Sequence, residues 1–165
     1  MTRLILVRHA KSDWDDPRLG DAQRPLNKRG RADAPALGAW LRGRGYAADA
    51  ALVSSAVRTT QTYARLHHEA TPPPARFLDA LYHAGPEVML ASLREAGPEV
   101  VMMVGHNPGI AGFAARLLAE PPRDADFDRY PTCAAAVIDF PVASWREIAW
   151  RTGTLVDFMI PKRLG

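Results

Sequence analysis

The sequence contains a single cysteine, Cys133, and no long apolar run. A lone cysteine excludes a disulfide within the chain. The first apolar stretch is only four residues long before Arg8, too short for a signal peptide, and no stretch approaches the roughly twenty apolar residues that cross a membrane. Together these absences predict a protein of the reducing, cytoplasmic compartment.

A strong excess of charge is also missing. The formal net charge is +3, and no Lys/Arg run has the density that nucleic-acid binding requires. A phosphate loop of the form G-x-x-x-x-G-K-(S/T) is absent, which argues against a nucleoside triphosphatase. We therefore expect no nucleic acid, membrane or cofactor as a partner, while the small basic excess suits an anionic ligand.

Apolar runs and helical periodicity alternate along the chain, and its 165 residues, 47% of them hydrophobic, fit one domain over residues 1–165. The expected strands are Leu4–Val7, Ala50–Val53, Val100–Val104, Ala134–Phe140 and Arg146–Thr152, the last two able to pair as a hairpin. The segment Phe77–Leu81 predicts either a short strand or an extended chain.

The expected helices are Arg29–Arg44, Ala56–His68, Pro86–Glu95 and Pro108–Ala119. Asn27 suits the N-cap of the first helix and Gly45 its end. This order of elements predicts an α/β fold, namely a three-layer α/β/α sandwich around a mostly parallel, mixed sheet.

Two predicted strands end at a histidine. One stops at Arg8 and His9, and another stops at Gly105 and His106. After His106, Asn107 suits an N-cap and Pro108 the first helical position, which would place this histidine at the positive end of a helix. Open α/β sheets carry their chemistry beyond the carboxyl ends of their strands, so both histidines are candidate site residues.

The strand Ala50–Val53 leads to an arginine at a similar junction. Ser54 and Ser55 offer an N-cap, and Arg58 falls in the first turn of the next helix, where the helix dipole opposes a cation unless it binds an anion. The polar loop Lys11–Pro25, which carries Ser12, Trp14 and Arg24, follows His9 directly and is expected to form one wall of a pocket.

Four segments, in this order, resemble signature elements of the histidine phosphatase superfamily. The run 6–10 resembles its Arg-His-Gly signature with Ala10 in place of glycine, and the run 24–30 resembles its R-P-L-(T/N)-x-x-G element. The run 54–62 resembles S-x-x-x-R-(A/T)-x-Q-T, and the run 104–108 resembles the second-histidine motif. The short length, Ala10 and the segment 158–164 are most similar to the SixA-like branch, named for a phosphohistidine phosphatase.

The resemblance implies a phosphoglycerate mutase-like fold and a metal-independent phosphatase. His9 would attack phosphorus in line and form a phosphohistidine that water hydrolyses, while Arg8, Arg58 and His106 hold the phosphoryl oxygens. Two further candidates for substrate binding are Arg24, as an additional phosphate contact, and Asn107, mainly as a cap. The implied partner is a phosphohistidine protein or a small phosphorylated metabolite.

These roles agree with the chemistry of phosphoryl transfer, which depends mostly on positioning and charge stabilisation. Arginine forks match phosphate oxygens with paired, charge-assisted hydrogen bonds. To attack phosphorus, His9 must present a neutral nitrogen, so its other ring nitrogen needs an acceptor such as a backbone carbonyl.

The chain departs from the family at the position of the general acid. Many relatives place a carboxylic acid where this chain has Ala80, and Asp79 is offset by one, which in an extended chain turns it to the opposite face. Without an acid, good leaving groups are favoured, such as the imidazole of phosphohistidine, which can leave already protonated. The insertions of mutases and acid phosphatases are absent, which argues for an open pocket. His83 either lines the pocket or packs near Tyr82.

Other chemistries remain as alternatives. The Asp13-Trp14-Asp15 segment is compatible with a magnesium-dependent phosphatase, but it does not follow a strand directly. Cys133 lacks the downstream arginine of a cysteine phosphatase, and the adjacent His67 and His68 point to different helix faces, which disfavours a metal site. A small-molecule phosphomonoesterase and a non-catalytic module that binds phospho-groups are the remaining candidates.

Overall fold

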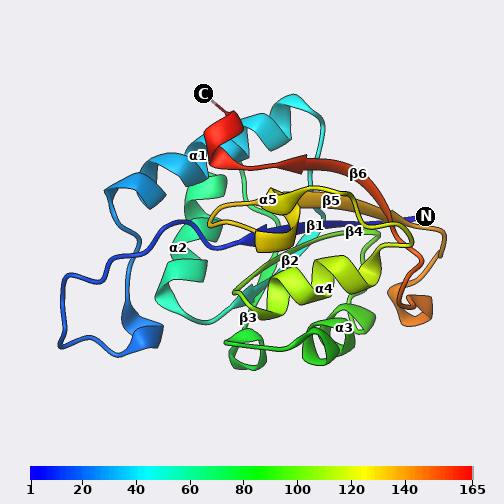
Figure 1. The fold of residues 1–165 in the computed structure, drawn as a ribbon, viewed down its shortest axis with the longest axis horizontal. Helices are drawn as coiled ribbons and strands as arrows, with labels where there is room; N and C mark the ends of the chain where they lie inside the picture. The colour runs from blue at the N-terminus through cyan, green and yellow to red at the C-terminus, as the bar shows by residue number, and fades with distance from the viewer. Residues whose placement is uncertain (165) are drawn as a thin grey trace.

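The computed structural model describes residues 1–164 as a central sheet between two layers of helices (Figure 1). Within this range the sheet has six strands in the order β3-β2-β4-β1-β5-β6. Strands β1 to β4 pair in parallel, and β5 runs antiparallel to both of its neighbours, which confirms the predicted α/β sandwich with a mostly parallel, mixed sheet. The strand bounds are β1 Thr2–Arg8, β2 Ala50–Ser54, β3 Ala75–Leu78, β4 Val100–Gly105, β5 Ala135–Phe140 and β6 Thr154–Met159.

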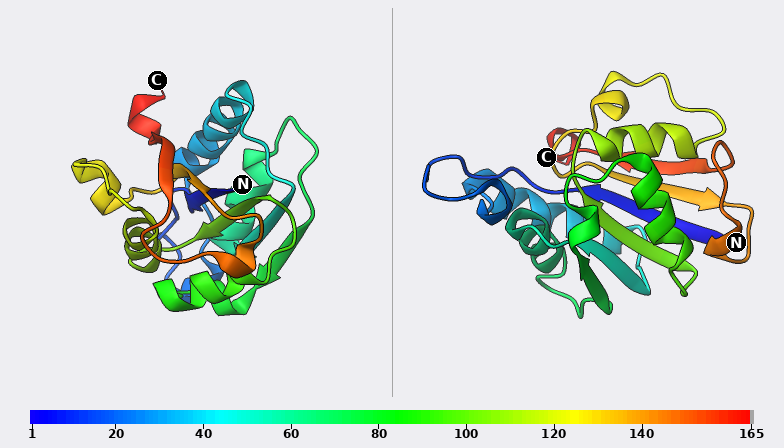
Figure 2. Two further views of the ribbon diagram at one scale, coloured as in Figure 1. Left: turned by 90° about the vertical axis from the view of Figure 1, so that its right-hand side faces the viewer. Right: turned by 90° about the horizontal axis from the view of Figure 1, so that it is seen from below.

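Helices cover both faces of the sheet, as the two views of Figure 2 show. Helices α1 (Lys28–Gly43) and α2 (Val57–Leu66) cover one face, and α3 (Pro86–Arg94), α4 (Gly109–Leu117) and α5 (Ala125–Arg129) cover the other. Among residues 1–164, no helix is both long and apolar enough to span a bilayer.

Alternate residues of the central strand β1 fill the two cores. Leu4 and Leu6 pack on the side of α3 and α4, whereas Ile5 and Val7 pack on the side of α1 and α2. All four side chains are fully buried. The sequence is continuously apolar here because a central parallel strand is covered on both faces.

The register of β1 against β4 places the ends of both strands together. Arg8 is paired with Gly105, so the residues that follow, His9 and His106, leave the sheet at the same edge. The amide of His9 also donates to the carbonyl of Gly105 at 3.1 Å. Strand β2 flanks β4 on its other side and brings Ser54 to this edge. In the right-hand view of Figure 2, the loop after β1 (blue) projects beyond it.

The predicted strand over Arg146–Thr152 is wrong. That segment contains the 3₁₀ turn η3 (Trp145–Glu147), and the edge strand β6 starts only at Thr154. Ile148 and Trp150 have the two-residue spacing of a strand, but they follow a turn in which Trp145 is buried and its indole donates to the carbonyl of Pro98 at 2.7 Å. The antiparallel pairing of the two C-terminal strands was predicted correctly, but helix α5 was not predicted.

The predicted helices agree with α1 to α4 to within two residues at each end. Asn27 is the N-cap of α1 as predicted, and its side chain accepts from the amide of Gly30 at 2.9 Å. Gly45 follows the C-cap of α1 with a positive φ, as predicted, but the other predicted N-caps are wrong, because α2 and α4 have Ala56 and Pro108 at the N-cap, with no side-chain cap bond. The predicted short strand over Phe77–Leu81 is correct for Phe77 and Leu78, which end β3, whereas Asp79–Leu81 form the 3₁₀ turn η2.

Candidate active site

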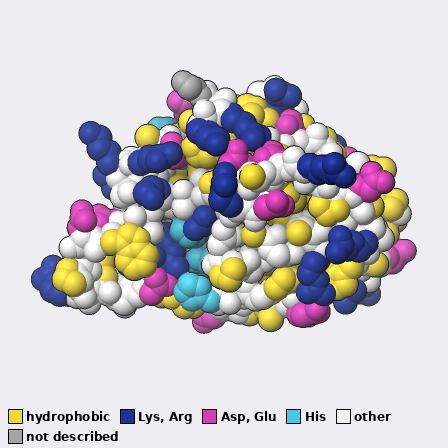
Figure 3. Space-filling model, viewed as in Figure 1, with side chains coloured by type: hydrophobic (Ala, Val, Ile, Leu, Met, Phe, Trp, Pro, Cys, Tyr) yellow, Lys and Arg dark blue, Asp and Glu magenta, His cyan; other side chains and the backbone are white. Residues whose placement is uncertain are grey.

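A cavity of about 280 Å³ opens at the carboxyl ends of β1, β2 and β4. All six residues predicted to be catalytic or to bind substrate line it, and the loop between His9 and Leu26 forms one wall, as expected. In Figure 3, Lys/Arg and His side chains meet in the hollow between this loop and the body of the protein. The lining residues are Arg8, His9, Lys11, Ser12, Trp14, Asp21, Arg24, Arg58, His83, His106, Asn107 and Thr132.

His9 is held as a neutral imidazole with one nitrogen available. Its Nδ1 lies 2.7 Å from the carbonyl oxygen of Ala10, and only a protonated nitrogen can bond to that oxygen. The lone pair of a neutral ring is therefore on Nε2. Burial and, to a smaller extent, the positive charges of Arg8 and Arg58 together lower the pKa of His9 to about 3, against the opposing effect of the Ala10 carbonyl.

His106 is buried beside His9, with ring centroids 5.3 Å apart. Its Nε2 lies 2.7 Å from Oγ of Ser54, and that hydroxyl also accepts from the amide of Ala56 at 3.4 Å. This hydroxyl donates no other hydrogen bond among residues 1–164, so we assign its proton to the bond with Nε2 and the ring proton to Nδ1. Burial lowers the pKa of His106 to about 3, with added repulsion from His9 and Arg58.

Several buried donors around the cavity have no acceptor in the described part of the chain. They are Nδ1 of His106 and the Nε atoms of Arg8 and Arg58. A buried donor without a partner costs about 1–3 kcal/mol, a cost that an anion in the cavity would remove. Arg8 is already oriented, since its Nη1 donates to the carbonyl of Tyr130 at 3.1 Å.

One carboxylate, that of Asp21, enters the cavity, and this residue was not predicted from the sequence. Asp21, in the 3₁₀ turn η1 (Asp21–Gln23), accepts from Nη2 of Arg58 at 2.9 Å, and its backbone carbonyl accepts from Nη1 at 2.7 Å. Its carboxylate also accepts from Arg24, Tyr82 and His83. The hydrogen bonds from Tyr82, Arg58 and His83 hold the pKa of Asp21 well below its usual range.

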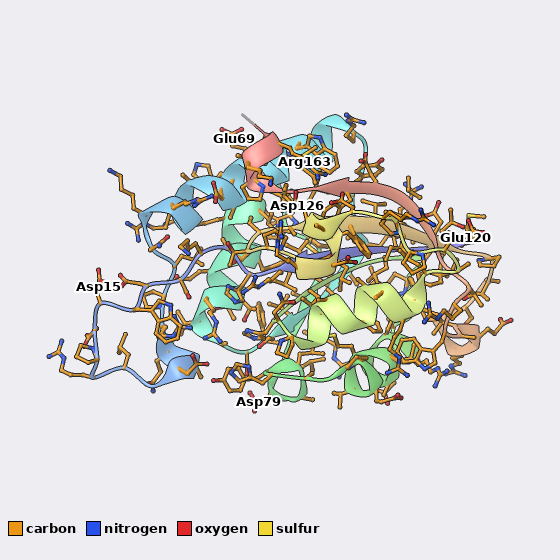
Figure 4. The ribbon with its side chains drawn as sticks, in the orientation of Figure 1. Asp15, Glu69, Asp79, Glu120, Asp126 and Arg163 are labelled. Atoms are coloured by element: carbon orange, nitrogen blue, oxygen red, sulfur yellow. The ribbon has the colours of Figure 1, made fainter. Side chains whose placement is uncertain are left out.

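Asp79 lies outside the cavity. Its carboxylate is exposed and accepts from Oγ of Ser55 at 2.5 Å, and in Figure 4 it points outward at the lower surface. Neither Asp79 nor Ala80 lines the cavity. The prediction that no acid occupies the usual position therefore agrees with the structure, although the expected extended backbone there does not.

Arg24 stabilises the cavity wall. Its guanidinium donates to Oγ of Ser12 at 2.7 Å and to Oδ1 of Asp21 at 3.1 Å, and it stacks 3.4 Å from the ring centroid of Trp14. Because these contacts occupy Nε and Nη1, Arg24 connects the two ends of the loop and orients Asp21. Asn107 donates to the carbonyls of Arg129 and Tyr130, which fixes its amide at the rim of the cavity.

The charge of the lining favours an anion, because Arg8, Lys11, Arg24 and Arg58 face a single carboxylate. Residues 1–164 contain no cluster of three or more His, Cys, Asp or Glu suited to a metal ion. Cys133 is fully buried, and burial raises the pKa of its thiol, so it is not a nucleophile.

The family model of the histidine phosphatase superfamily (branch 1) matches residues 4–83. An uncharacterized protein of Mycobacterium tuberculosis is 33% identical over 163 residues, which cover 94% of this chain and 100% of the relative. The chain belongs to the histidine phosphatase superfamily. Members of this superfamily act on phosphorylated proteins or metabolites.

Two solved structures place this superfamily member near the SixA phosphatases. A putative phosphohistidine phosphatase SixA from Nakamurella multipartitia has a TM-score of 0.81 and 28% identity, over 97% of this chain and 96% of that one. The protein histidine phosphatase SixA in complex with tungstate has the same TM-score at 22% identity, over 99% and 100% of the two chains. The phosphoglycerate mutase-like fold is thereby confirmed.

Proposed function

We propose that this protein is a metal-independent phosphatase that acts through a covalent phosphohistidine on His9. The observation that carries the proposal is the tautomer of His9. With Nδ1 donating to the carbonyl of Ala10, a neutral Nε2 is available in a cavity that is lined by four cations. A low pKa keeps this nitrogen unprotonated at neutral pH, as a nucleophile must be.

The unpartnered donors define where the phosphoryl group would bind. Arg8, Arg58 and Nδ1 of His106 would donate to its three non-bridging oxygens, which carry the charge of the transition state. Arg58 keeps its orientation because Asp21 holds both of its Nη atoms, and each Nη has a second hydrogen for a phosphoryl oxygen.

The preferred substrate we propose is a phosphohistidine protein. Asp79 lies outside the cavity and Asp21 is ionised, so the cavity holds no protonated carboxyl group for a poor leaving group. The imidazole of phosphohistidine can depart already protonated and needs no such group. A small phosphomonoester with a good leaving group is the second candidate.

Trapping of the phosphoenzyme tests this function. The protein is mixed with a ³²P-labelled phosphohistidine protein and quenched in base, where a phosphohistidine is stable, and the labelled peptide is sequenced. We expect label on His9 in the wild type and neither label nor turnover in His9→Ala, while a chelator leaves the activity unchanged.

Three results would contradict the proposal: label on another residue, full activity of His9→Ala, or loss of activity in the chelator. A wild-type protein that binds a phosphohistidine protein without turnover would instead indicate the non-catalytic module.

A further inference from the structure

The proposed mechanism needs a group that moves protons at the mouth of the cavity. The incoming His9 nitrogen cannot protonate the leaving group, and water must lose a proton when it attacks the phosphoenzyme. The lining residues that exchange protons or carry a carboxylate are His9, Lys11, Asp21, His83 and His106. His9 and His106 already have roles at the phosphorus, so the remaining candidates for proton transfer are Lys11, Asp21 and His83.

Asp21 cannot be the donor, because its carboxylate accepts four hydrogen bonds, from Arg24, Arg58, Tyr82 and His83. Those donors keep it ionised. Lys11 is exposed at the rim, and no hydrogen bond orients its ammonium among the described residues. A general acid must be held within hydrogen-bond reach of the atom that it protonates, and Lys11 is not held in this way.

His83 has a fixed position and an accessible ring. Its Nε2 lies 3.0 Å from Oδ2 of Asp21, and its side chain is 50% exposed at the cavity mouth. The ring also lies beside Tyr82 and His106, at centroid distances of 4.2 and 5.4 Å. No hydrogen bond in the described structure involves Nδ1, which leaves that nitrogen to exchange a proton with a bound molecule.

The backbone supports this placement. His83 has a φ of 53°, in the left-handed region that residues other than glycine adopt rarely. The next residue, Ala84, presses its carbonyl oxygen against Gly109 at the start of α4, where a Cβ would lie only 1.8 Å away. An unfavourable φ that the surrounding packing maintains is typical of functional positions.

We propose that His83, oriented by Asp21, is the proton-transfer residue of the phosphatase reaction; this rests on the proposed function. In the first step, Nε2 of His9 forms a bond to phosphorus as the bond to the leaving group breaks; when the substrate is a phosphomonoester, Nδ1–H of His83 gives its proton to the departing oxygen. In the second step, neutral His83 takes a proton from the attacking water. The oxygen–phosphorus bond forms, and the electron pair of the broken nitrogen–phosphorus bond returns to His9.

The charged groups around His83 suit this cycle. Asp21 from η1 stabilises the imidazolium, whereas Arg58 from α2 and a protonated His106 after β4 would oppose it. The low pKa of His106 keeps that ring neutral, so it places no positive charge beside His83. Tyr82 donates to the same carboxylate and contributes no charge.

The test compares leaving groups. His83→Asn removes the proton transfer, and asparagine tolerates a positive φ, so the fold is expected to survive. The matched control is His68→Asn, at an exposed histidine outside the cavity. Both variants and the wild type are assayed with 4-nitrophenyl phosphate, whose leaving group is good, and with phenyl phosphate, whose leaving group is poor. Thermal melts verify the folding of each.

We expect His83→Asn to lose about 100-fold or more in kcat/KM with phenyl phosphate, but less than about tenfold with 4-nitrophenyl phosphate, since proton transfer contributes most to poor leaving groups. In single-turnover experiments, hydrolysis of the phosphoenzyme should slow by the same factor whichever substrate formed it. Free imidazole should restore part of the rate in His83→Ala.

An equal and small loss on both substrates would overturn the role of His83. If the phosphoenzyme on His9 still forms under those conditions, the proposed function stands and only the inference fails. If the wild type forms no phosphoenzyme at His9, both fail. His68→Asn must match the wild type, because a loss there would mean that the assay reports stability rather than proton transfer.

Discussion

Oγ of Ser54 and Nε2 of His106 lie 2.7 Å apart, and both residues are almost completely buried. Ser54 thus fixes the ring proton of His106 on Nδ1, the nitrogen that we assign to a phosphoryl oxygen. Ser54→Ala should lower kcat by about tenfold, the value of roughly one hydrogen bond, because the ring can then hold its proton on either nitrogen.

The matched control for this prediction is Ser55→Ala. Its hydroxyl bonds to Asp79 outside the cavity, so the variant should keep the wild-type rate. Steady-state kinetics gives the rates, and ¹⁵N chemical shifts of the His106 ring report its tautomer. An unchanged rate in Ser54→Ala would contradict the assignment.

Removal of the Arg58 guanidinium should lower the catalytic rate more than Ser54→Ala does. Arg58 is 2% exposed and is held by Asp21 at both Nη atoms, so it is oriented before substrate binds. We expect Arg58→Ala to lose about 3 kcal/mol of transition-state stabilisation, by analogy with the loss of an oriented donor to an anion. Arg58→Lys, which retains the charge without the fork, should recover only part of it. The measurement is kcat/KM, with the exposed Arg76→Ala as control.

The two buried histidines predict a loss of stability in acid. Their pKa values are about 3 in the folded protein, below the ordinary value of about 6.5, so between these pH values the unfolded chain binds more protons. Their contribution to stability is fully present above pH 6.5 and decreases as the pH falls toward 3, by roughly 3 kcal/mol for each histidine at pH 4.5. Urea unfolding at a series of pH values measures this slope, which should be shallower in His106→Asn. An identical slope in that variant would exclude the histidine as its source.

The packing of Gly109 against Ala84 predicts a stability effect. A Cβ at Gly109 would lie 1.8 Å from the Ala84 carbonyl oxygen, so Gly109→Ala must displace backbone and should cost about 1–3 kcal/mol. A Cβ added at Gly43, in α1, would meet no atom within 4 Å, so Gly43→Ala should be neutral or slightly stabilising. Chemical denaturation of both variants tests the contrast. Equal stabilities would contradict it.

The sequence predicted those parts of the site that follow strands. The apolar runs before Arg8, His9 and His106 indicate buried parallel strands, and such strands bring their carboxyl ends to one edge. Arg58 was predictable for the same reason, because it begins the helix after β2.

The sequence predicted that the loop after His9 would form a wall of the cavity, but not which of its carboxylates would point inward. Asp21 reaches the cavity through a 3₁₀ turn in a polar loop, where no periodicity indicates which side chain points inward. His83 remained ambiguous because its position depends on a left-handed backbone and on the contact between Ala84 and Gly109. The C-terminal strand was misplaced because Ile148 and Trp150 have the two-residue spacing of a strand, but both pack against the core from the irregular segment that follows a 3₁₀ turn.

The order of strands has a consequence for how the site comes into being. Strand β4 lies between β1 and β2, so a nascent chain that has emerged only as far as β3 has His9 and Arg58 without the strand that joins them. The anion site therefore forms only when β4 pairs between β1 and β2. Such pairing is slow, because segments distant in the sequence lose conformational entropy before their contacts stabilise them. During refolding, catalytic activity should appear when β4 has paired with both of its neighbours. Recovery of turnover therefore measures the rate at which the sheet is completed.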